Sequence, residues 1–233
     1  MSLSSTIIAA LKFRGGVVIA ADSQATDLVA QVRWQVEKLD QVGRYPLIAG
    51  FSGSLGRIQE ARSKLEAIKL HPRQFTNRET VRTAIQSALQ PVYRYIQQNW
   101  SSPPNPFWDV TCWGLTVMWT GDDSEILELE ANGESSFHDY FHAIGSAGQT
   151  AYAIYRTLGG RRLTDVEEQK AIWIMLRILR TCIGVESWGV DDPLSVWVLT
   201  GKGPRHLSLD EIQAQLQSVD EWEEKERLHF LNS

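Results

Sequence analysis

A threonine stands close to the start of the chain, at the head of an apolar stretch, where a hydroxyl has no evident packing use. Thr6 opens the run "TIIAALKF", and five residues precede it. A threonine hydroxyl is a weak nucleophile at neutral pH and needs a base beside it. When threonine is the first residue, its own α-amino group, with an ordinary pKa of about 8, takes the proton. The position of Thr6 therefore predicts that Met1–Ser5 form a short leader that is removed.

Such a nucleophile needs a cation to keep the amine neutral and a backbone N–H to stabilise the oxyanion. Lys38 in "VEKLDQV" is the candidate cation, and Asp22, at the end of an apolar run, is placed to pair with it. Gly50 in "IAGFSG" is the candidate oxyanion donor, because a residue without a side chain lets a carbonyl approach closely. Each residue alone has an ordinary structural explanation, as a strand, surface or turn residue. Their joint spacing favours a catalytic set.

At this point the residues resemble a known family. The stretch "KFRGGVVIAADSQAT" is similar to the N-terminal hairpin of proteasome β-type subunits and their bacterial relatives, the threonine peptidases of the N-terminal nucleophile class. Counted without gaps from Asp22, Thr6 matches the catalytic threonine and Lys38 the catalytic lysine. Gly50 matches the oxyanion glycine, and Ser146 in "GSAG" matches a serine beside the nucleophile. The resemblance runs roughly from residue 4 to residue 200.

The chain also departs from the family pattern. Ser5 stands where the family usually has glycine before the nucleophile, and isoleucines follow Thr6 where further threonines are common. The family supplies a late aspartate near the threonine. In the matching stretch "RTCIGVESWGVDDP", Glu186 is the best counterpart and Asp191 the alternative. A one-residue gap in the hairpin turn would move the nucleophile to Ser5, which is the weaker alignment.

The elements that must position these residues alternate between strands and pairs of helices. Two apolar runs around Gly15-Gly16 predict a buried β-hairpin. Two helices follow, one from Leu55 and one opened by a capping box of Thr76 and Glu79; then come further strands, two more helices, a strand and an acidic C-terminal helix. This order predicts an α+β fold of four layers, αββα, in which helix pairs cover two stacked, mainly antiparallel sheets. We expect one domain over residues 6–233, with an acidic helical tail over 209–233.

Three smaller features have structural interpretations. Ser146 also fits a helix N-cap, because it precedes a helical stretch in a glycine-rich turn. His138 and His142 are four residues apart in a strand-like stretch, where that spacing does not bring two side chains to one metal, so both are taken as structural. Val36, Ile48 and Ser52 are candidates for a small apolar specificity pocket.

Composition excludes several classes of partner. The formal net charge of -5 offers no basic surface for a nucleic acid. Cys112 and Cys182 are the only cysteines, which fits a reducing compartment, and no apolar run is long enough to cross a bilayer, so we expect a soluble cytoplasmic protein.

The chemistry requires neither metal nor cofactor. The resemblance implies self-assembly into a ring, an ATP-dependent unfoldase partner, and peptide or unfolded protein as substrate.

The activity expected is therefore that of a threonine endopeptidase that processes itself. Two alternatives remain open. One is a catalytically silent subunit of such a ring, favoured by Ser5, Ile7 and Ile8 and opposed by the intact Asp22, Lys38 and Gly50. The other is an N-terminal nucleophile amidohydrolase that acts on small amides.

Overall fold

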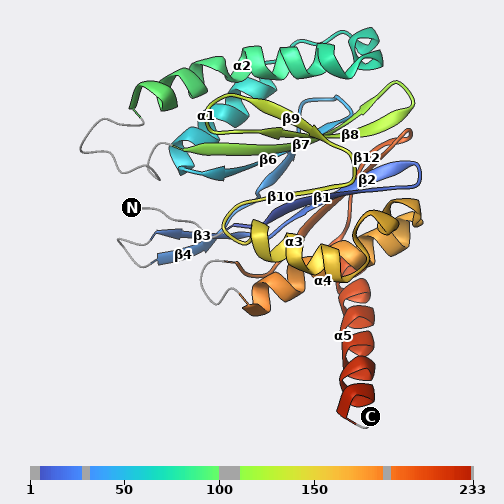
Figure 1. Cartoon of the computed structure of the whole chain (residues 1–233). Helices are drawn as coiled ribbons and strands as arrows, with labels where there is room; N and C mark the ends of the chain where they lie inside the picture. The colour runs from blue at the N-terminus through green and yellow to red at the C-terminus, as the bar shows by residue number, and fades with distance from the viewer. Residues whose placement is uncertain (1–5, 28–31, 100–110, 186–189, 232–233) are drawn as a thin grey trace.

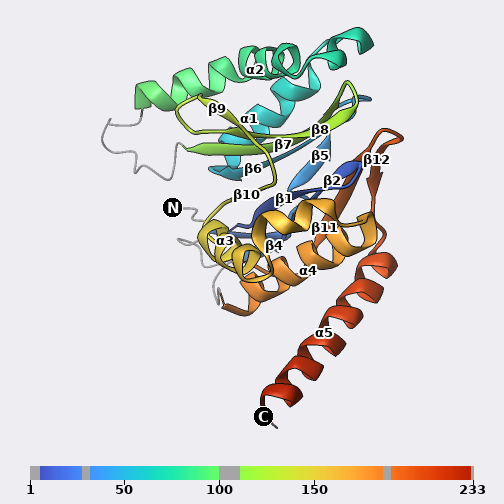
Figure 2. The ribbon, with the colours of Figure 1, turned by 45° about the vertical axis from the view of Figure 1, so that its right-hand side comes forward.

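The computed structural model describes residues 6–27, 32–99, 111–185 and 190–231. Two five-stranded sheets lie face to face, and helices cover the outer face of each (Figure 1). The view turned by 45° shows the same sequence of layers, with α5 directed away from them (Figure 2). The predicted αββα fold is thus confirmed.

The first sheet contains the N-terminal hairpin and has the strand order β10-β1-β2-β11-β12. All its recorded pairings are antiparallel. Its strands are β1 (Ile8–Phe13), β2 (Gly16–Ala21), β10 (Phe141–Ile144), β11 (Ser195–Thr200) and β12 (Gly203–His206). Gly15 adopts φ +85° in the turn between β1 and β2, a conformation that suits glycine. The glycine pair thus forms the predicted hairpin.

The second sheet follows sequence order, β5-β6-β7-β8-β9, and is also antiparallel. Its strands are β5 (Leu39–Gln41), β6 (Leu47–Gly53), β7 (Cys112–Thr120), β8 (Asp123–Leu129) and β9 (Ser135–His138). A separate two-stranded hairpin of β3 (Gln24–Asp27) and β4 (Val32–Gln35) follows β2 in the sequence and precedes β5. The residue after β4, Val36, donates its N–H to the carbonyl of Ser23, which holds the base of this hairpin close to the end of β2.

Residues alternate between two cores along the buried strands, as the period of two requires. In β1, Ile8 and Ala10 pack between the sheets, whereas Ala9 and Leu11 pack against the helices. The helices over the first sheet are α3 (Gly148–Thr157) and α4 (Glu168–Val185), and those over the second are α1 (Leu55–Glu66) and α2 (Arg78–Asn99). Short 3₁₀ helices cover Pro72–Thr76 and Gly160–Asp165. Every strand of the central hairpin is therefore covered on both faces, which explains its almost continuous apolar sequence.

The start of α2 differs from the prediction by one residue. Asn77, not Thr76, caps the helix: its side-chain oxygen accepts the backbone N–H of Glu79 at 2.9 Å and that of Thr80 at 3.3 Å. Thr76 ends the preceding 3₁₀ helix, and its hydroxyl donates to the carbonyl of Arg73. An asparagine side chain serves as well as a threonine hydroxyl at this position, so the sequence alone did not separate the two.

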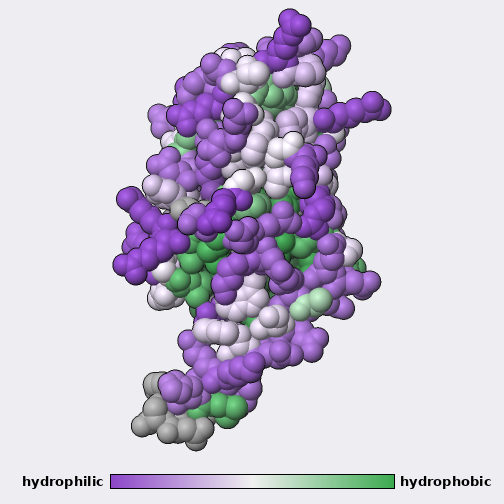
Figure 3. All heavy atoms as spheres, turned by 90° about the vertical axis from the view of Figure 1, so that its right-hand side faces the viewer, coloured by the Kyte–Doolittle hydropathy of each residue, from purple (hydrophilic) through white to green (hydrophobic). Residues whose placement is uncertain are grey.

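The last helix, α5 (Leu209–Leu231), begins with a capping box. The Ser208 N–H donates to the Glu211 carboxylate at 2.7 Å, and the Glu211 N–H donates to the Ser208 hydroxyl at 3.3 Å. Near its middle, Trp222 stacks edge-on against Trp173 of α4 with Arg177 over its ring. The helix then projects from the layers, and mostly hydrophilic residues cover its surface, apart from an apolar group near its end (Figure 3).

Among the described residues, no helix combines the length and apolar character that crossing a bilayer would need.

Candidate functional site

The antiparallel registers of β1 bring the candidate residues together around Thr6. Ile8 pairs with Ala21 of β2 on one side and with Ile144 of β10 on the other. Continuing each register by two residues places Thr6 between the end of β2, where Asp22 lies, and the turn after β10, which contains Ser146. Thr6 is 1% exposed, so this meeting point is buried.

Lys38 lies between Thr6 and Asp22. Its ammonium nitrogen is 3.1 Å from Thr6 Oγ1 and 2.7 Å from Asp22 Oδ1. The Asp22 carboxylate also accepts the backbone N–H of Ile7 at 2.9 Å and that of Gln24 at 3.1 Å. Because the carboxylate is held by three donors, it fixes Lys38 against the threonine hydroxyl. The structure thus brings these three residues together, and their catalytic role stays a prediction.

Burial dominates the electrostatics of this pair. Loss of solvent lowers the pKa of Lys38, and the neighbouring Asp22 carboxylate opposes that shift only in part. Burial likewise raises the pKa of Asp22, against the opposing effects of Lys38 and the two backbone N–H groups. A lysine with a lowered pKa exchanges a proton with a neighbouring hydroxyl or amine more readily than a solvated one.

The turn after β10 holds the main chain of Thr6. The Thr6 N–H donates to the Ser146 hydroxyl at 3.1 Å, and the Ala147 N–H donates to the Thr6 carbonyl at 3.4 Å. Gly145 adopts φ +94°, and a Cβ at this position would lie 2.0 Å from the Thr6 carbonyl oxygen. Ser146 thus contacts the nitrogen that would become the α-amine. The roles of Gly145 and Ala147 were missed, although the glycine in "IGSAG" was the available signal.

Gly50 lies within β6, opposite Leu39 of β5 and Leu115 of β7. A Cβ there would lie 2.7 Å from Leu39 and 3.1 Å from Ile8. Close packing alone is therefore enough to require glycine at this position. The use of the Gly50 N–H as an oxyanion donor stays a prediction.

Two predictions concern residues outside the described part of the chain, namely Glu186 as the late acidic residue and Met1–Ser5 as a leader, including Ser5 as the alternative nucleophile. Asp191, the other acidic candidate, is described. Its carbonyl accepts the Ser23 N–H at 3.3 Å, which places its backbone beside the residue that follows Asp22.

A cavity of about 290 Å³ opens beside Thr6 and Lys38. Its other lining residues are Ala25, Trp34, Val36, Glu37, Phe51, Gly53, Leu55, Ile58, Gln59 and Arg62. Val36 is thus placed as predicted, whereas Ile48 is fully buried between the two sheets. The apolar wall suits a substrate side chain, and Glu37 and Arg62 add one charge of each sign.

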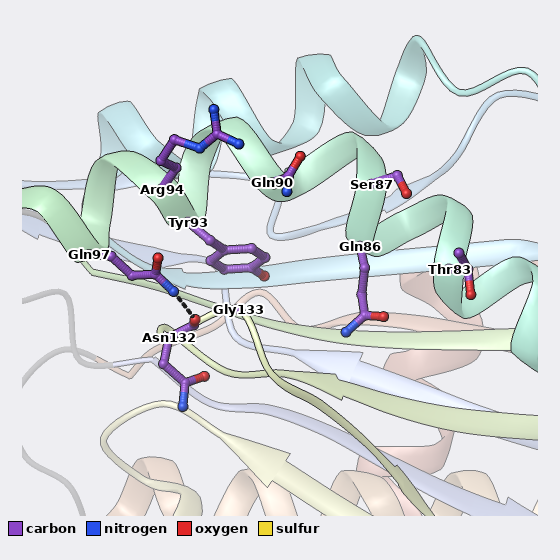
Figure 4. Close-up of a pocket in the computed structure, with 9 residues that line it drawn as sticks. All are labelled: Thr83, Gln86, Ser87, Gln90, Tyr93, Arg94, Gln97, Asn132 and Gly133. Atoms are coloured by element: carbon purple, nitrogen blue, oxygen red, sulfur yellow. Dashed lines mark hydrogen bonds between the residues drawn. The ribbon is translucent and has the colours of Figure 1, made fainter.

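A second, more polar pocket of about 360 Å³ lies along α2, and Figure 4 shows its residues. Thr83, Gln86 and Gln90 project from successive turns of the helix, and Gln97 donates to the carbonyl of Asn132 at 2.6 Å. None of the lining residues belongs to the Thr6 group, so this pocket is separate from the candidate site.

The expectation that His138 and His142 do not converge is wrong. Their rings stack with centroids 3.6 Å apart, and both Nε2 atoms face Glu128 Oε2, at 2.9 and 3.0 Å. The prediction treated the stretch as one strand. The chain instead leaves the second sheet after His138 and enters the first sheet at Phe141, so the two side chains meet in the crossing. The hydrogen bond from His138 and the closeness of His142 lower the pKa of Glu128 to about 2.

Comparisons with known proteins agree with this architecture. The family model described as "Proteasome subunit" matches residues 1–191. Among solved structures, a Gly-1 mutant of Anbu from Hyphomicrobium sp. strain MC1 superposes with a TM-score of 0.74 at 15% identity, covering 98% of this chain and 97% of the other. Anbu from Yersinia bercovieri, described as an ancestral beta-subunit, gives a TM-score of 0.74 at 14% identity, with 97% of each chain covered. No match was found among curated protein sequences.

Proposed function

The chain belongs to the proteasome subunit family, and from this premise we propose that it is an N-terminal threonine peptidase that exposes its own nucleophile. One observation carries the proposal: a buried lysine held by a buried aspartate lies 3.1 Å from the hydroxyl of Thr6. A purely structural subunit has no use for a buried charge pair aimed at a hydroxyl, because burying charges costs free energy that apolar packing would avoid.

The first reaction is removal of Met1–Ser5. Thr6 Oγ1 attacks the Ser5 carbonyl carbon, and the bond from that carbon to the Thr6 nitrogen breaks, so the acyl group moves from nitrogen to oxygen. The hydroxyl proton passes to the nitrogen, with Lys38 as the nearest group able to relay it. Water then hydrolyses the ester, which releases the leader and leaves Thr6 with a free α-amine.

The second reaction is hydrolysis of a substrate peptide bond. The α-amine takes the Oγ1 proton while the oxygen attacks the scissile carbonyl, and the proton is then given to the leaving amine. The Lys38 charge lowers the pKa of the α-amine, and Ser146, already 3.1 Å from that nitrogen, orients it. The Gly50 N–H is the proposed oxyanion donor, and Glu186 or Asp191 the proposed acidic support. Water then attacks the acyl ester on Thr6 Oγ1. The α-amine takes the proton of the water and gives it to Oγ1, which releases the acyl group as a carboxylic acid.

The cavity beside Thr6 is the proposed binding site for the substrate residue before the scissile bond, because it is the space that Thr6 and Lys38 share. We propose peptides or unfolded protein as substrate, copies of this chain in a ring as the assembly, and an ATP-dependent unfoldase as a partner. Cys112 and Cys182 are both buried thiols, which supports a reducing compartment such as the cytoplasm.

The silent ring subunit remains the alternative, and Ser5 is the feature that favours it. Ile7 and Ile8 no longer do so, because both are fully buried in the cores on either side of β1 and their types are explained by packing.

Intact mass of the purified protein tests the proposal. Wild type should lack Met1–Ser5, Thr6→Ala should retain them, and Thr83→Ala, which alters an exposed threonine on α2, should behave as wild type. The processed protein should cleave fluorogenic peptides in preference to small amides. A wild type that keeps its leader under these conditions would make the silent subunit the better account, and cleavage by Thr6→Ala would exclude this mechanism.

A further inference from the structure

A second group of side chains able to bind a ligand lies at the crossing between the two sheets. Glu128 comes from β8, His138 from the end of β9, and His142 from β10. Their side-chain donor atoms all lie within 4.8 Å of one another. These three residues form a group separate from the nucleophile, since none of them takes part in the contacts of Lys38 and Asp22.

The hydrogen bonds of His142 determine which of its nitrogens is protonated. Its Nδ1 lies 2.6 Å from the Tyr152 hydroxyl, which is itself 3.5 Å from the Phe141 carbonyl oxygen. A metal-binding His142 would carry its proton on Nδ1, where the Tyr152 oxygen can accept it while the tyrosine donates to the Phe141 carbonyl. A neutral His142 then carries a lone pair on Nε2.

That lone pair faces a carboxylate. His142 Nε2 is 3.0 Å from Glu128 Oε2, yet within the described residues this buried nitrogen makes no hydrogen bond of acceptable geometry. Two acceptors at this separation repel unless a cation lies with them. His138 presents its own Nε2 to the same carboxylate oxygen at 2.9 Å, so three donor atoms converge on one small volume.

The donor set matches a transition metal better than a hard cation. Two imidazole nitrogens and one carboxylate oxygen are the three protein ligands of many zinc sites, with bonds of about 2.0–2.2 Å. Imidazole nitrogen is a poor ligand for Mg²⁺ or Ca²⁺, which take oxygen. The Tyr152 hydroxyl on Nδ1 of His142 is the kind of outer partner that metal-bound histidines have, because it fixes the tautomer and the ring orientation.

We propose that Glu128, His138 and His142 bind one divalent transition-metal ion of the Zn²⁺ class. The ion would sit among the three donor atoms once the stacked imidazole rings turn so that both Nε2 lone pairs point at it, and a water would complete four-coordination. It would fasten β8 of the second sheet to β10 of the first, and so hold the two sheets together where the chain crosses. This site shares no side chain with the proposed peptidase centre.

Metal binding to the full-length protein tests the proposal directly. Wild type, freed of metal by chelation, should bind one equivalent of Co²⁺ with visible d–d absorption, and Zn²⁺ should displace it. Glu128→Gln and His138→Gln should each weaken binding at least about 10-fold to 100-fold, the range for loss of a metal-site contact. His138 is only half-buried and so should tolerate replacement. His229→Gln, at an exposed histidine on α5, is the matched control and should bind as wild type.

Thermal unfolding gives a second readout that needs no catalysis. Zn²⁺ at 100 times the wild-type Kd should raise the Tm of wild type by about 5–10 °C, and should raise that of His138→Gln by no more than about half as much. Thr6→Ala should bind metal as wild type does, which separates this proposal from the peptidase mechanism. The proposal would be overturned if His229→Gln weakened metal binding as much as Glu128→Gln does, if Glu128→Gln left binding unchanged, or if the metal had no effect on the Tm of wild type.

Discussion

Replacing Lys38 by methionine should destabilise the protein strongly, whatever the chain catalyses. Methionine keeps most of the apolar volume of lysine but removes the charge that lies 2.7 Å from Asp22. Asp22 is fully buried, so its carboxylate would be left with only the N–H groups of Ile7 and Gln24. Breaking one partner of a buried ion pair costs about 3–5 kcal/mol. For a chain of this length the Tm should fall by about 6–20 °C.

The pH dependence of that loss identifies its cause. Burial already raises the pKa of Asp22 above its unfolded value of 3.8, and Lys38 is the largest opposing influence. Without Lys38 the folded-state pKa rises further. A carboxyl whose pKa is raised by folding makes its full contribution to the stability of the folded protein below its unfolded pKa. That contribution is lost as pH rises through the folded pKa. Lys38→Met should therefore be much closer to wild type at pH 5 than at pH 7.5.

Urea unfolding followed by tryptophan fluorescence measures the effect at both pH values. The double variant Asp22→Asn/Lys38→Met should recover part of the loss at pH 7.5, because it buries no unpaired charge, although the Asn oxygen can accept only one of the two N–H groups that Asp22 accepts. Lys202→Met, in the exposed turn between β11 and β12, serves as the control for the substitution itself. A loss that is equal at the two pH values, or a double variant no more stable than Lys38→Met, would refute the reasoning.

Two further predictions concern the processed peptidase that we propose. Its kcat/KM should rise with pH as the Thr6 α-amine loses its proton, and should fall again at higher pH as Lys38 loses its own. Because burial lowers the pKa of Lys38, that fall should begin below the ordinary lysine pKa of 10.5. A profile that stays flat up to pH 10.5 would contradict this role. Gly145→Ala should reduce kcat/KM by about 100-fold, since its Cβ would displace the Thr6 carbonyl and such misplacement costs about that factor. The control is Gly160→Ala, which also has a positive φ but meets nothing within 4 Å, and equal activity of the two variants would argue against the effect.

The sequence contains enough to predict most of the fold and the centre of the site. The apolar runs around Gly15-Gly16 can only be a hairpin covered on both faces, and that hairpin sets the spacing from Thr6 to Asp22. Lys38 follows from the gapless match to the proteasome family, counted forward from Asp22. Local patterns therefore sufficed wherever contacts come from neighbouring strands.

Contacts between segments far apart in the chain were not predictable in the same way. The glycine in "IGSAG" indicates a tight turn, but it does not indicate which residue the turn contacts, since the contact of Gly145 with the Thr6 carbonyl depends on β10 pairing with β1 across more than a hundred residues. The error over His138 and His142 has a related cause. A run that reads as one strand is two strands of different sheets, and side-chain spacing within a strand says nothing about residues on either side of such a crossing.

The two sites share one strand, which gives the metal proposal a consequence for the nucleophile. His142 pairs with Ala10 and Ile144 pairs with Ile8, so β10 carries a rigid register from the crossing to the turn that contains Ser146. That turn contacts the Thr6 nitrogen through Ser146 and the Thr6 carbonyl through Ala147. Fastening β10 to β8 at His142 therefore restrains the same backbone that places Thr6, and losing the metal should loosen the site without touching any group that reacts.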